Sequence, residues 1–441
     1  MKKLIENGVF VLGGHVQGYG IVRIFGENNI PSIVFDTTNQ IIARHSKYCI
    51  DFYRVDYLAI IEKLIEIGKT GKYDNWLLFP TDDYYVRLLS QNKAELSKYF
   101  KVTIDDWEII DLFFNKRNSY PLADSVDVPI PNTYYPNTID DIKQIENIIE
   151  FPCIIKPAVM LDFYRHFKKK VFICNKSSEL SSNYLKAIEI VKPDEILVQE
   201  IIPGGSENQY SVGIFFNKNE SYNFIVGRRK RQHPIDFGNA TTFAESVVIP
   251  ELIEYAHRIL NSANFWGICE VEFKFDERDG NYKFLEVNPR TWKWHYISEP
   301  ANIPFLLSMY NYLVKSKPII KKDYKYSKGI LINKNSGRIL KGILSVNIFG
   351  SMPDYDGIKK IADKYKLFLL EDSCESLGSD YFGIKSGKIG NASVFAFYAN
   401  KQVTTGEGGM ILTDDFKMYE KVKAYRNQGR RDMDLWLNHS Y

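Results

Sequence analysis

The sequence predicts a protein of mixed α/β and α+β class, and three stretches carry this prediction. Short apolar runs alternate with helical patterns from residue 8 to about 112, which is typical of a mostly parallel sheet covered by helices. Two alternating runs flank a turn containing Asp279-Gly280 and predict an antiparallel hairpin at 269–290. A second strand–helix–strand pattern follows residue 338. The chain of 441 residues has room for two to four domains.

Composition narrows the class of protein. The hydrophobic content of 45% and the charged content of 25% are ordinary for a soluble globular protein. The net charge of +3 gives no argument for a nucleic-acid or membrane partner. The cysteines number five, are scattered and form no CxxC pair, which favours a reducing compartment. No run approaches the roughly 18 apolar residues that span a bilayer. We expect a cytoplasmic protein; a homo-oligomer is left open.

The first domain opens with a strand–helix–strand unit. An apolar strand at 8–12 runs into a glycine-rich turn at 13–20 and a helix, and a second strand at 31–35 ends at Asp36. Glycines at the first turn and an acid after the second strand indicate a dinucleotide site. The glycine spacing does not fit GxGxxG, so the alternative is a fold in which the loop only makes a tight turn. The remaining elements of the domain are expected at 58–67, 76–79 and 100–104.

A lysine ends the next apolar strand, at 152–156. Lys156 is either a surface residue whose stem lies along apolar neighbours or a ligand for an anion. The run before it is apolar on both faces, which favours the ligand. A loop is expected at 158–167. Further elements are expected at 139–149, 171–174, 195–199, 210–216, 222–227 and 250–263.

A short basic run, 228–233, comes directly after the expected strand at 222–227. Such a run is usually a solvated face or a nucleic-acid patch. Its position at the end of a strand makes an anionic ligand at least as good an interpretation.

The hairpin places acids among apolar strand residues. Glu272 lies between Val271 and Phe273, and burying a carboxylate there is costly unless a partner binds it. On the second strand, every second residue shares one face, and these residues are Glu286, Asn288 and Arg290. Two carboxylates and an amide oxygen suit Mg²⁺ and nucleotide phosphates. The alternative is a hairpin with a charged outer face.

Together these pieces resemble the ATP-grasp superfamily over about residues 8–320, with the layout of its carboxylate–amine ligases. The motifs are Lys116 at a helix start, IIKPA at 154–158, VQEIIPGG at 198–205, EVEFKFD at 270–276 and FLEVNPRTWKWH at 284–295. The resemblance implies a Rossmann-like pre-ATP-grasp domain at 1–112 and a two-lobed ATP-grasp domain at 113–320. It also implies ATP and Mg²⁺, and activation of a carboxylate as an acyl-phosphate that an amine attacks.

The resemblance also implies roles for single residues. Lys116 and Lys156 would contact ATP phosphates, and the backbone from Glu200 to Ile202 would contact the adenine, with Glu207 a weaker candidate for the ribose. Arg290 would stabilise the phosphate or acyl-phosphate. The expected Mg²⁺ ligands are Glu272, Glu286 and Asn288, and the residues expected to hold the substrate carboxylate or phosphate are Arg228, Lys230 and Arg231.

The loop at 158–167 departs from the superfamily, whose members often carry a glycine-rich flap there. No glycine occurs in this loop. The cover over the phosphates would then come from side chains such as Arg165, Lys168 or Lys170.

After a linker expected at 321–337, residues 338–441 resemble a part of the DegT-type, pyridoxal-phosphate-dependent sugar aminotransferases. The motifs are VFAFYANK at 394–401 and TTGEGGMILTDD at 404–415, after expected elements at 342–349, 356–365 and 367–370. The resemblance implies that Lys401 forms the Schiff base, that Asp372 pairs with the pyridinium nitrogen and that Glu375 lies beside the ring.

Only about 100 residues match, from the middle of a much longer fold. We therefore expect an incomplete fold-type-I fragment, from a truncated or fused gene, whose open sheet edges favour self-association. The main prediction is a ligase acting on a small-molecule carboxylate and amine. The alternatives are a pyridoxal-phosphate aminotransferase and a non-catalytic nucleotide-binding protein.

Overall fold

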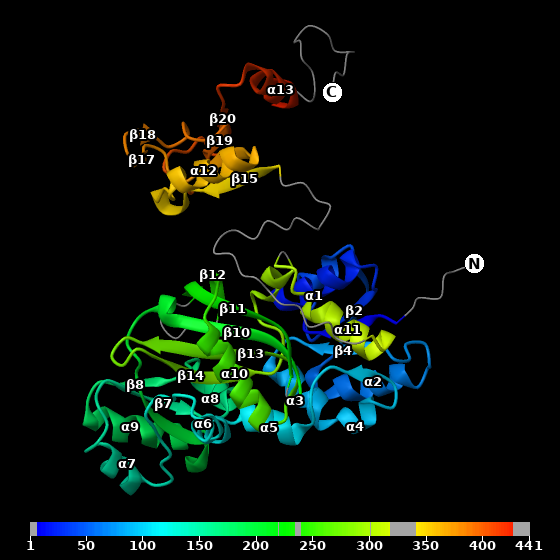
Figure 1. The fold of residues 1–441 in the computed structure, drawn as a ribbon, viewed down its shortest axis with the longest axis vertical. Helices are drawn as coiled ribbons and strands as arrows, with labels where there is room; N and C mark the ends of the chain where they lie inside the picture. Colours follow the sequence, from blue (N-terminus) through cyan, green and yellow to red (C-terminus); the bar gives the residue numbers. More distant parts are fainter. Residues whose placement is uncertain (1–6, 219, 234–239, 300, 318–340, 427–441) are drawn as a thin grey trace. The chain divides into compact units, whose positions relative to one another are not determined.

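The computed structural model describes residues 7–426 except 219, 234–239, 300 and 318–340 (Figure 1). The chain divides into two compact units, Met1–Asn333 and Lys334–Tyr441. The mixed α/β class expected from the sequence is confirmed. The expected linker at 321–337 lies outside the described residues, and the boundary near residue 112 stays a prediction.

The first domain is built on a parallel sheet of order β3-β2-β1-β4-β5. The strand β3 escaped prediction because it lies at the sheet edge, where its residues are exposed or half-buried and give no apolar run. In Figure 1 the helix α11 (Phe305–Lys315) lies beside α1 (Val16–Glu27), far apart in the sequence. The strands are β1 (Val9–Leu12), β2 (Ser32–Asp36), β3 (Cys49–Arg54), β4 (Leu77–Pro80) and β5 (Lys101–Val102), and the other helices are α2 (Ile60–Gly68), α3 (Asp83–Gln91), α4 (Lys93–Leu96) and α5 (Trp107–Phe114).

The glycine-rich turn after β1 is held by the side chain of Asp36. The Gly14 amide donates to Asp36 Oδ2 at 2.7 Å, and the Thr38 amide donates to the other oxygen of the same carboxylate at 3.1 Å. A Cβ on Gly18 would meet the Gly13 carbonyl oxygen at 2.0 Å. The acid and the glycines thus serve chain packing, which supports the tight-turn alternative.

A second sheet, of order β6-β9-β7-β8, forms a separate lobe. The loop expected at 158–167 contains the helix α8 (Met160–Phe167) instead. Helical spacing brings the rings of Phe163 and Phe167 to 4.8 Å, and both pack on Phe172 of β8. The other elements of the lobe are α6 (Lys116–Asp124), β6 (Thr133–Tyr134), α7 (Ile139–Ile145), β7 (Cys153–Pro157), β8 (Phe172–Cys174), α9 (Ser177–Ile188) and β9 (Ile196–Glu200).

The third sheet is antiparallel, with the order β12-β11-β10-β13-β14. The predicted hairpin is confirmed as β13 (Trp266–Asp276) and β14 (Asn281–Asn288). The basic run does not follow a strand, because β11 (Glu220–His233) continues through it and pairs with β12 (Ala240–Val247). The remaining strand is β10 (Gln209–Asn217), and the helix α10 (Pro250–Ser262) packs on this sheet.

The second unit holds a sheet of order β15-β16-β19-β20. Its centre is the buried carboxylate of Glu371, which accepts backbone hydrogen bonds from Gly387 and Ile389 at 2.7 and 3.2 Å. The last strand, β20, is exposed along its whole length. The main elements are β15 (Gly342–Val346), α12 (Tyr355–Tyr365), β16 (Phe368–Asp372), β19 (Ala392–Ala396), β20 (Gly409–Leu412) and α13 (Phe416–Arg426).

Within the described part of the chain, no helix has both the length and the apolar character that a bilayer crossing requires. All five cysteines are free thiols.

Candidate active site

A cavity of about 1040 Å³ lies in the first unit, between the first domain and the antiparallel sheet. Six of the predicted site residues line it together: Lys116, Lys170, Glu272, Glu286, Asn288 and Arg290. The starts of α1 and α3 form the facing wall with residues that sequence reasoning did not select, among them His15, Asp82 and Asp83.

Strand register brings the acids together. Glu272 and Glu286 are directly opposite each other on β13 and β14. The Asn288 side chain donates to Glu272 Oε1 at 3.1 Å, and the Lys116 amine lies 3.1 Å from Glu286 Oε2. Burial works to raise the pKa of Glu286, but the charges of Lys116 and Lys170 outweigh it and lower the pKa to about 2. The carboxylate is therefore ionised and available to a cation.

Arg290 joins the acidic end of the cavity to the first domain. Its Nε lies 2.7 Å from Asp83 Oδ1, and its Nη2 donates to Asn288 Oδ1 at 3.1 Å. Burial opposes the charged guanidinium, but Asp83 more than compensates, and the pKa of Arg290 is raised. The arginine is thus a fixed positive charge beside the acids.

Lys156 is buried on β7 and is absent from the described cavity lining. Its amine donates to Tyr120 Oη at 2.6 Å and to Gln199 Oε1 at 2.8 Å. Burial, followed by repulsion from Lys116, lowers the pKa of Lys156 to about 7. An anion reaching this amine would favour its charged form.

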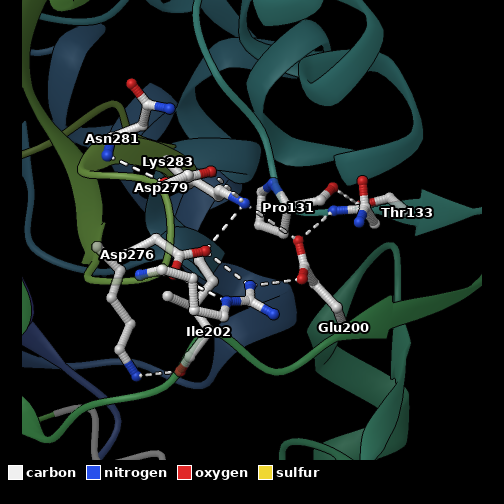
Figure 2. Close-up of polar contacts among 11 residues, drawn as sticks. Pro131, Thr133, Glu200, Ile202, Asp276, Asp279, Asn281 and Lys283 are labelled. Carbon is white, nitrogen blue, oxygen red and sulfur yellow. Dashed lines mark hydrogen bonds and ion pairs between the residues drawn. The ribbon is translucent and has the colours of Figure 1, made fainter. Parts of the chain in front are cut away.

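Glu200 belongs to a cluster of ions where the hairpin meets the second sheet (Figure 2). Its carboxylate lies 2.6 Å from the Arg278 guanidinium and 3.4 Å from the Lys283 amine, and it accepts the Asn132 amide at 2.8 Å. Asp276, fully buried, binds the same two cations at 2.6 and 2.9 Å. The Glu200 side chain thus joins two lobes.

The neighbouring hinge residues are fixed in the same way. The Ile202 carbonyl accepts the Lys274 amine at 2.8 Å, a contact drawn in Figure 2. Glu207 is exposed in a short turn, and its carbonyl accepts Arg228 Nε at 2.8 Å. Neither Ile202 nor Glu207 is among the described residues that line the cavity.

On β11 the structure brings Arg229 to the cavity rather than the three basic residues expected there. Arg228 and Lys230 alternate to the other face, where both lie near Glu245, at 4.0 and 3.5 Å. Arg231 is exposed, next to an irregularity in the strand pairing. Arg229 lies 3.3 Å from Glu272 Oε2. The described lining of this cavity thus includes none of Arg228, Lys230 and Arg231, which were expected to contact the substrate.

The sequence also contained a signal for some lining residues that were not predicted. Glu270 precedes Glu272 by two positions, so strand periodicity alone puts both on one face. Burial and the charge of Glu272 raise the pKa of Glu270 to about 8. Lys293 and Trp294, three and four residues after Arg290, also line the cavity.

The glycine-free flap contributes one lysine. Lys170 lines the cavity, together with Tyr164 of α8, and burial lowers the pKa of its amine. Arg165 and Lys168 are exposed instead. Lys168 ends α8 with a left-handed backbone (φ 53°).

The oxygens of Glu272, Glu286 and Asn288 are a hard donor set of the kind that Mg²⁺ binds. Across the described residues no three His, Cys, Asp or Glu side chains form a ready metal cluster. A metal here would therefore share its ligands with nucleotide phosphates and water, as Mg²⁺ commonly does.

In the second unit the three residues expected at pyridoxal phosphate lie near the carboxyl end of β16. Lys401 Nζ lies 3.1 Å from Glu375 Oε1, and Glu375 also accepts the Phe349 amide at 3.1 Å. Asp372 accepts the Cys374 amide at 3.1 Å. An acid and an amine of the right kinds are present, but the amine is engaged in an ion pair.

Comparisons with known proteins agree with this geometry. Residues 115–304 match the family described as carbamoyl-phosphate synthase L chain, ATP binding domain. Residues 330–440 match the DegT/DnrJ/EryC1/StrS aminotransferase family. The resemblances to the ATP-grasp superfamily and to the DegT-type aminotransferases are thus confirmed.

Individual relatives fall into the same two groups. D-aspartate ligase of Enterococcus faecium is 25% identical over 351 residues, which cover 74% of this chain and 81% of the relative. GDP-perosamine synthase of Caulobacter vibrioides is 42% identical over 89 residues, so this chain spans only 24% of that protein. The solved biotin carboxylase from Campylobacter jejuni shares the fold, with a TM-score of 0.57, 14% identity and coverage of 72% of each chain.

Proposed function

We propose that the first unit is an ATP- and Mg²⁺-dependent ligase that activates a carboxylate as an acyl-phosphate for attack by an amine. The observation that carries the proposal is the cavity where Glu272 and Glu286 face Lys116 and Arg290. The similarity to D-aspartate ligase supports an amino acid or related acid among the substrates.

The acidic and the basic residues of the cavity would have different roles. Glu272, Glu286 and Asn288 would hold Mg²⁺, which neutralises phosphate charge when bound. Lys116 and Lys170 would bind the phosphates on the other side, with Lys156 behind them. Arg290 would hold the carboxylate in line with the γ-phosphorus and stabilise charge as it develops there.

The reaction proceeds in two substitutions. A carboxylate oxygen attacks the γ-phosphorus of ATP, the bond from phosphorus to the bridging oxygen breaks, and ADP leaves. The amine nitrogen then attacks the acyl carbon, inorganic phosphate leaves, and the nitrogen releases a proton. The backbone between Glu200 and Ile202 is proposed to contact the adenine, because the Glu200 side chain is engaged elsewhere.

Phosphate release from ATP, measured across a panel of carboxylic acids and amines, tests this function. We expect release that requires Mg²⁺, an acid and an amine together. Nucleotide binding without turnover over a broad panel would instead favour a non-catalytic nucleotide-binding protein.

A second candidate, a pyridoxal-phosphate aminotransferase, is favoured by the placement of Lys401, Glu375 and Asp372 near one strand end. When bound, the cofactor would supply an electron sink for the carbon bonded to the substrate nitrogen. Lys401 would hold it covalently through its amine, and Asp372 would hold a proton on the ring nitrogen. The expected signature is an absorbance near the visible edge that vanishes in Lys401→Ala; without such a band this candidate is rejected.

A further inference from the structure

The cavity contains more positive charge than ATP phosphates would use under the proposed function, on which this inference rests. Lys116, Lys156 and Lys170 are assigned to phosphates, and Arg290 to the reacting carboxylate. Arg87 of α3 also lines the cavity, and so do two further cations, Arg229 and Lys293. They come from β11 and from the segment after β14, so two separate parts of the chain direct cations to one place.

Arg229 is held in a fixed orientation. Its guanidinium donates to Gln209 Oε1 at 2.5 Å and to Gln232 Oε1 at 3.0 Å, and it lies 3.3 Å from Glu272. The side chain is 9% exposed. A buried and already oriented guanidinium loses little entropy on binding a planar anion such as a carboxylate.

Lys293 lies among other cations. Lys293 is exposed, yet partial loss of solvent around its amine is the largest cause that lowers the pKa of this group, and the charges of Lys170, Arg290 and Arg229 act in the same direction. Glu270 acts in the opposite direction. An anion at this place would offset the repulsion among the cations.

Trp294 forms a rigid wall next to these cations. Its indole Nε1 donates to Glu270 Oε1 at 3.1 Å. The ring covers Gly227 of β11 so closely that a Cβ there would meet it at 2.6 Å. The ring therefore has no room to turn toward β11, and it presents a flat apolar surface beside the charged groups.

We propose that Arg229, Lys293 and Trp294 form a subsite for a carboxylate that the reaction does not consume. The group would belong either to the acid, which is then a dicarboxylate, or to the amine, which is then an amino acid. Arg290 takes the carboxylate that is activated, and Trp294 packs against the carbon atoms between the substrate's polar groups.

Matched substrate pairs measured on the full chain separate the two sources. In the acid arm, succinate is compared with butyrate and aspartate with alanine; in the amine arm, glycine is compared with methylamine. We expect one arm to prefer the substrate with the extra carboxylate by at least tenfold in kcat/KM. Equal kcat/KM within every pair would overturn the subsite.

Variants at Lys293 test the residue itself. Lys293→Met should raise the KM for the preferred substrate at least tenfold, leave the KM for ATP within twofold and abolish the preference; Lys293→Arg should restore most of it. The exposed Lys143, paired with Asp140 on α7, provides the matched control Lys143→Met. A loss in Lys293→Met that is equal for both members of a pair would contradict the proposal.

If Lys293→Met does not fold, a binding measurement with Trp294→Phe still tests the subsite. Titration with the preferred substrate should change the tryptophan fluorescence of the wild type, and Trp294→Phe should lose most of that change. A change that survives in Trp294→Phe would count against the subsite. If the wild type releases no phosphate with any acid and amine, the proposed function itself fails, a result distinct from activity without carboxylate preference.

Discussion

At the scale of single residues, the account depends on carboxylates that the fold keeps charged. Glu286 is the clearest case, because Lys116 lies 3.1 Å away and holds its pKa at about 2 despite burial. Without a bound metal the lysine neutralises the acid. With Mg²⁺ and phosphates present, both side chains have new partners of opposite charge.

Glu286→Gln should remove the charge at nearly constant shape. We expect phosphate release to fall by about 100-fold or more, as for the loss of one strong electrostatic contact at a transition state, and the Mg²⁺ requirement to rise. Steady-state kinetics over a Mg²⁺ titration measure both. Glu251→Gln, at an acid exposed on α10, is the control; equal losses in the two variants would contradict a role for Glu286 at the metal.

Lys156 leads to a prediction about pH. Its pKa of about 7 lies below the ordinary lysine value, and contact with phosphate favours the charged form. Nucleotide binding should therefore take up a proton, and affinity should fall as the pH rises above about 7, by at most about tenfold per unit. Calorimetric titration with ATP from pH 6 to 9 measures this, and Lys156→Met should show a much flatter profile. Identical profiles would exclude the amine from the phosphate site.

At the scale of elements, the hairpin is held to the rest of the first unit by the ion cluster of Figure 2. Asp276 is fully buried between Arg278 and Lys283, and these cations hold its pKa well below the ordinary value. A depressed carboxylate pKa stabilises the folded state above the unfolded pKa of about 4. That contribution is lost as the pH falls below this value.

Asp276→Asn should lower the free energy of unfolding by about 3 kcal/mol at neutral pH. This value is at the lower end of the range expected when a buried ion pair is broken. The loss should be limited because Glu200 still pairs with both cations. Denaturant titrations at pH 7 and pH 3 measure the difference, which should shrink at the lower pH. Asp140→Asn, at an exposed acid, should change stability little; a comparable effect in both variants would contradict the cluster's role.

Periodicity made the hairpin predictable, since alternating residues and an Asp-Gly turn define both strands locally. The same periodicity would have selected Arg229 over its neighbours if β11 had been known to continue through the basic run. The ion pair of Asp83 with Arg290 could not be predicted from the sequence, because a contact between residues so far apart along the chain depends on how the domains pack. The helix α8 replaced an expected loop because its aromatic residues pack on β8.

At the scale of the whole molecule, the chain combines two units that match their relatives over different shares of the relatives' length. The first matches D-aspartate ligase over most of that protein's length, whereas the second spans about a quarter of the aminotransferase relatives. The match to D-aspartate ligase thus covers most of that relative, whereas the match to GDP-perosamine synthase covers a small share of it.

Nucleotide should stabilise one unit selectively. Scanning calorimetry of the full chain should show two transitions, and ATP with Mg²⁺ at about 100 times the dissociation constant should add about 2.7 kcal/mol to the stability of one of them. Lys401→Ala is the control, since it changes only the second unit. An equal shift of both transitions would contradict independent units.

In the proposed ligase reaction, a carboxylate oxygen attacks the γ-phosphorus of ATP. The most direct measurement uses an acid labelled with ¹⁸O in its carboxylate and mass spectrometry of the phosphate released during turnover with an amine. Each released phosphate should carry one labelled oxygen, since the oxygen that attacks phosphorus leaves with it. Unlabelled phosphate, released at the same rate with or without acid, would contradict the account.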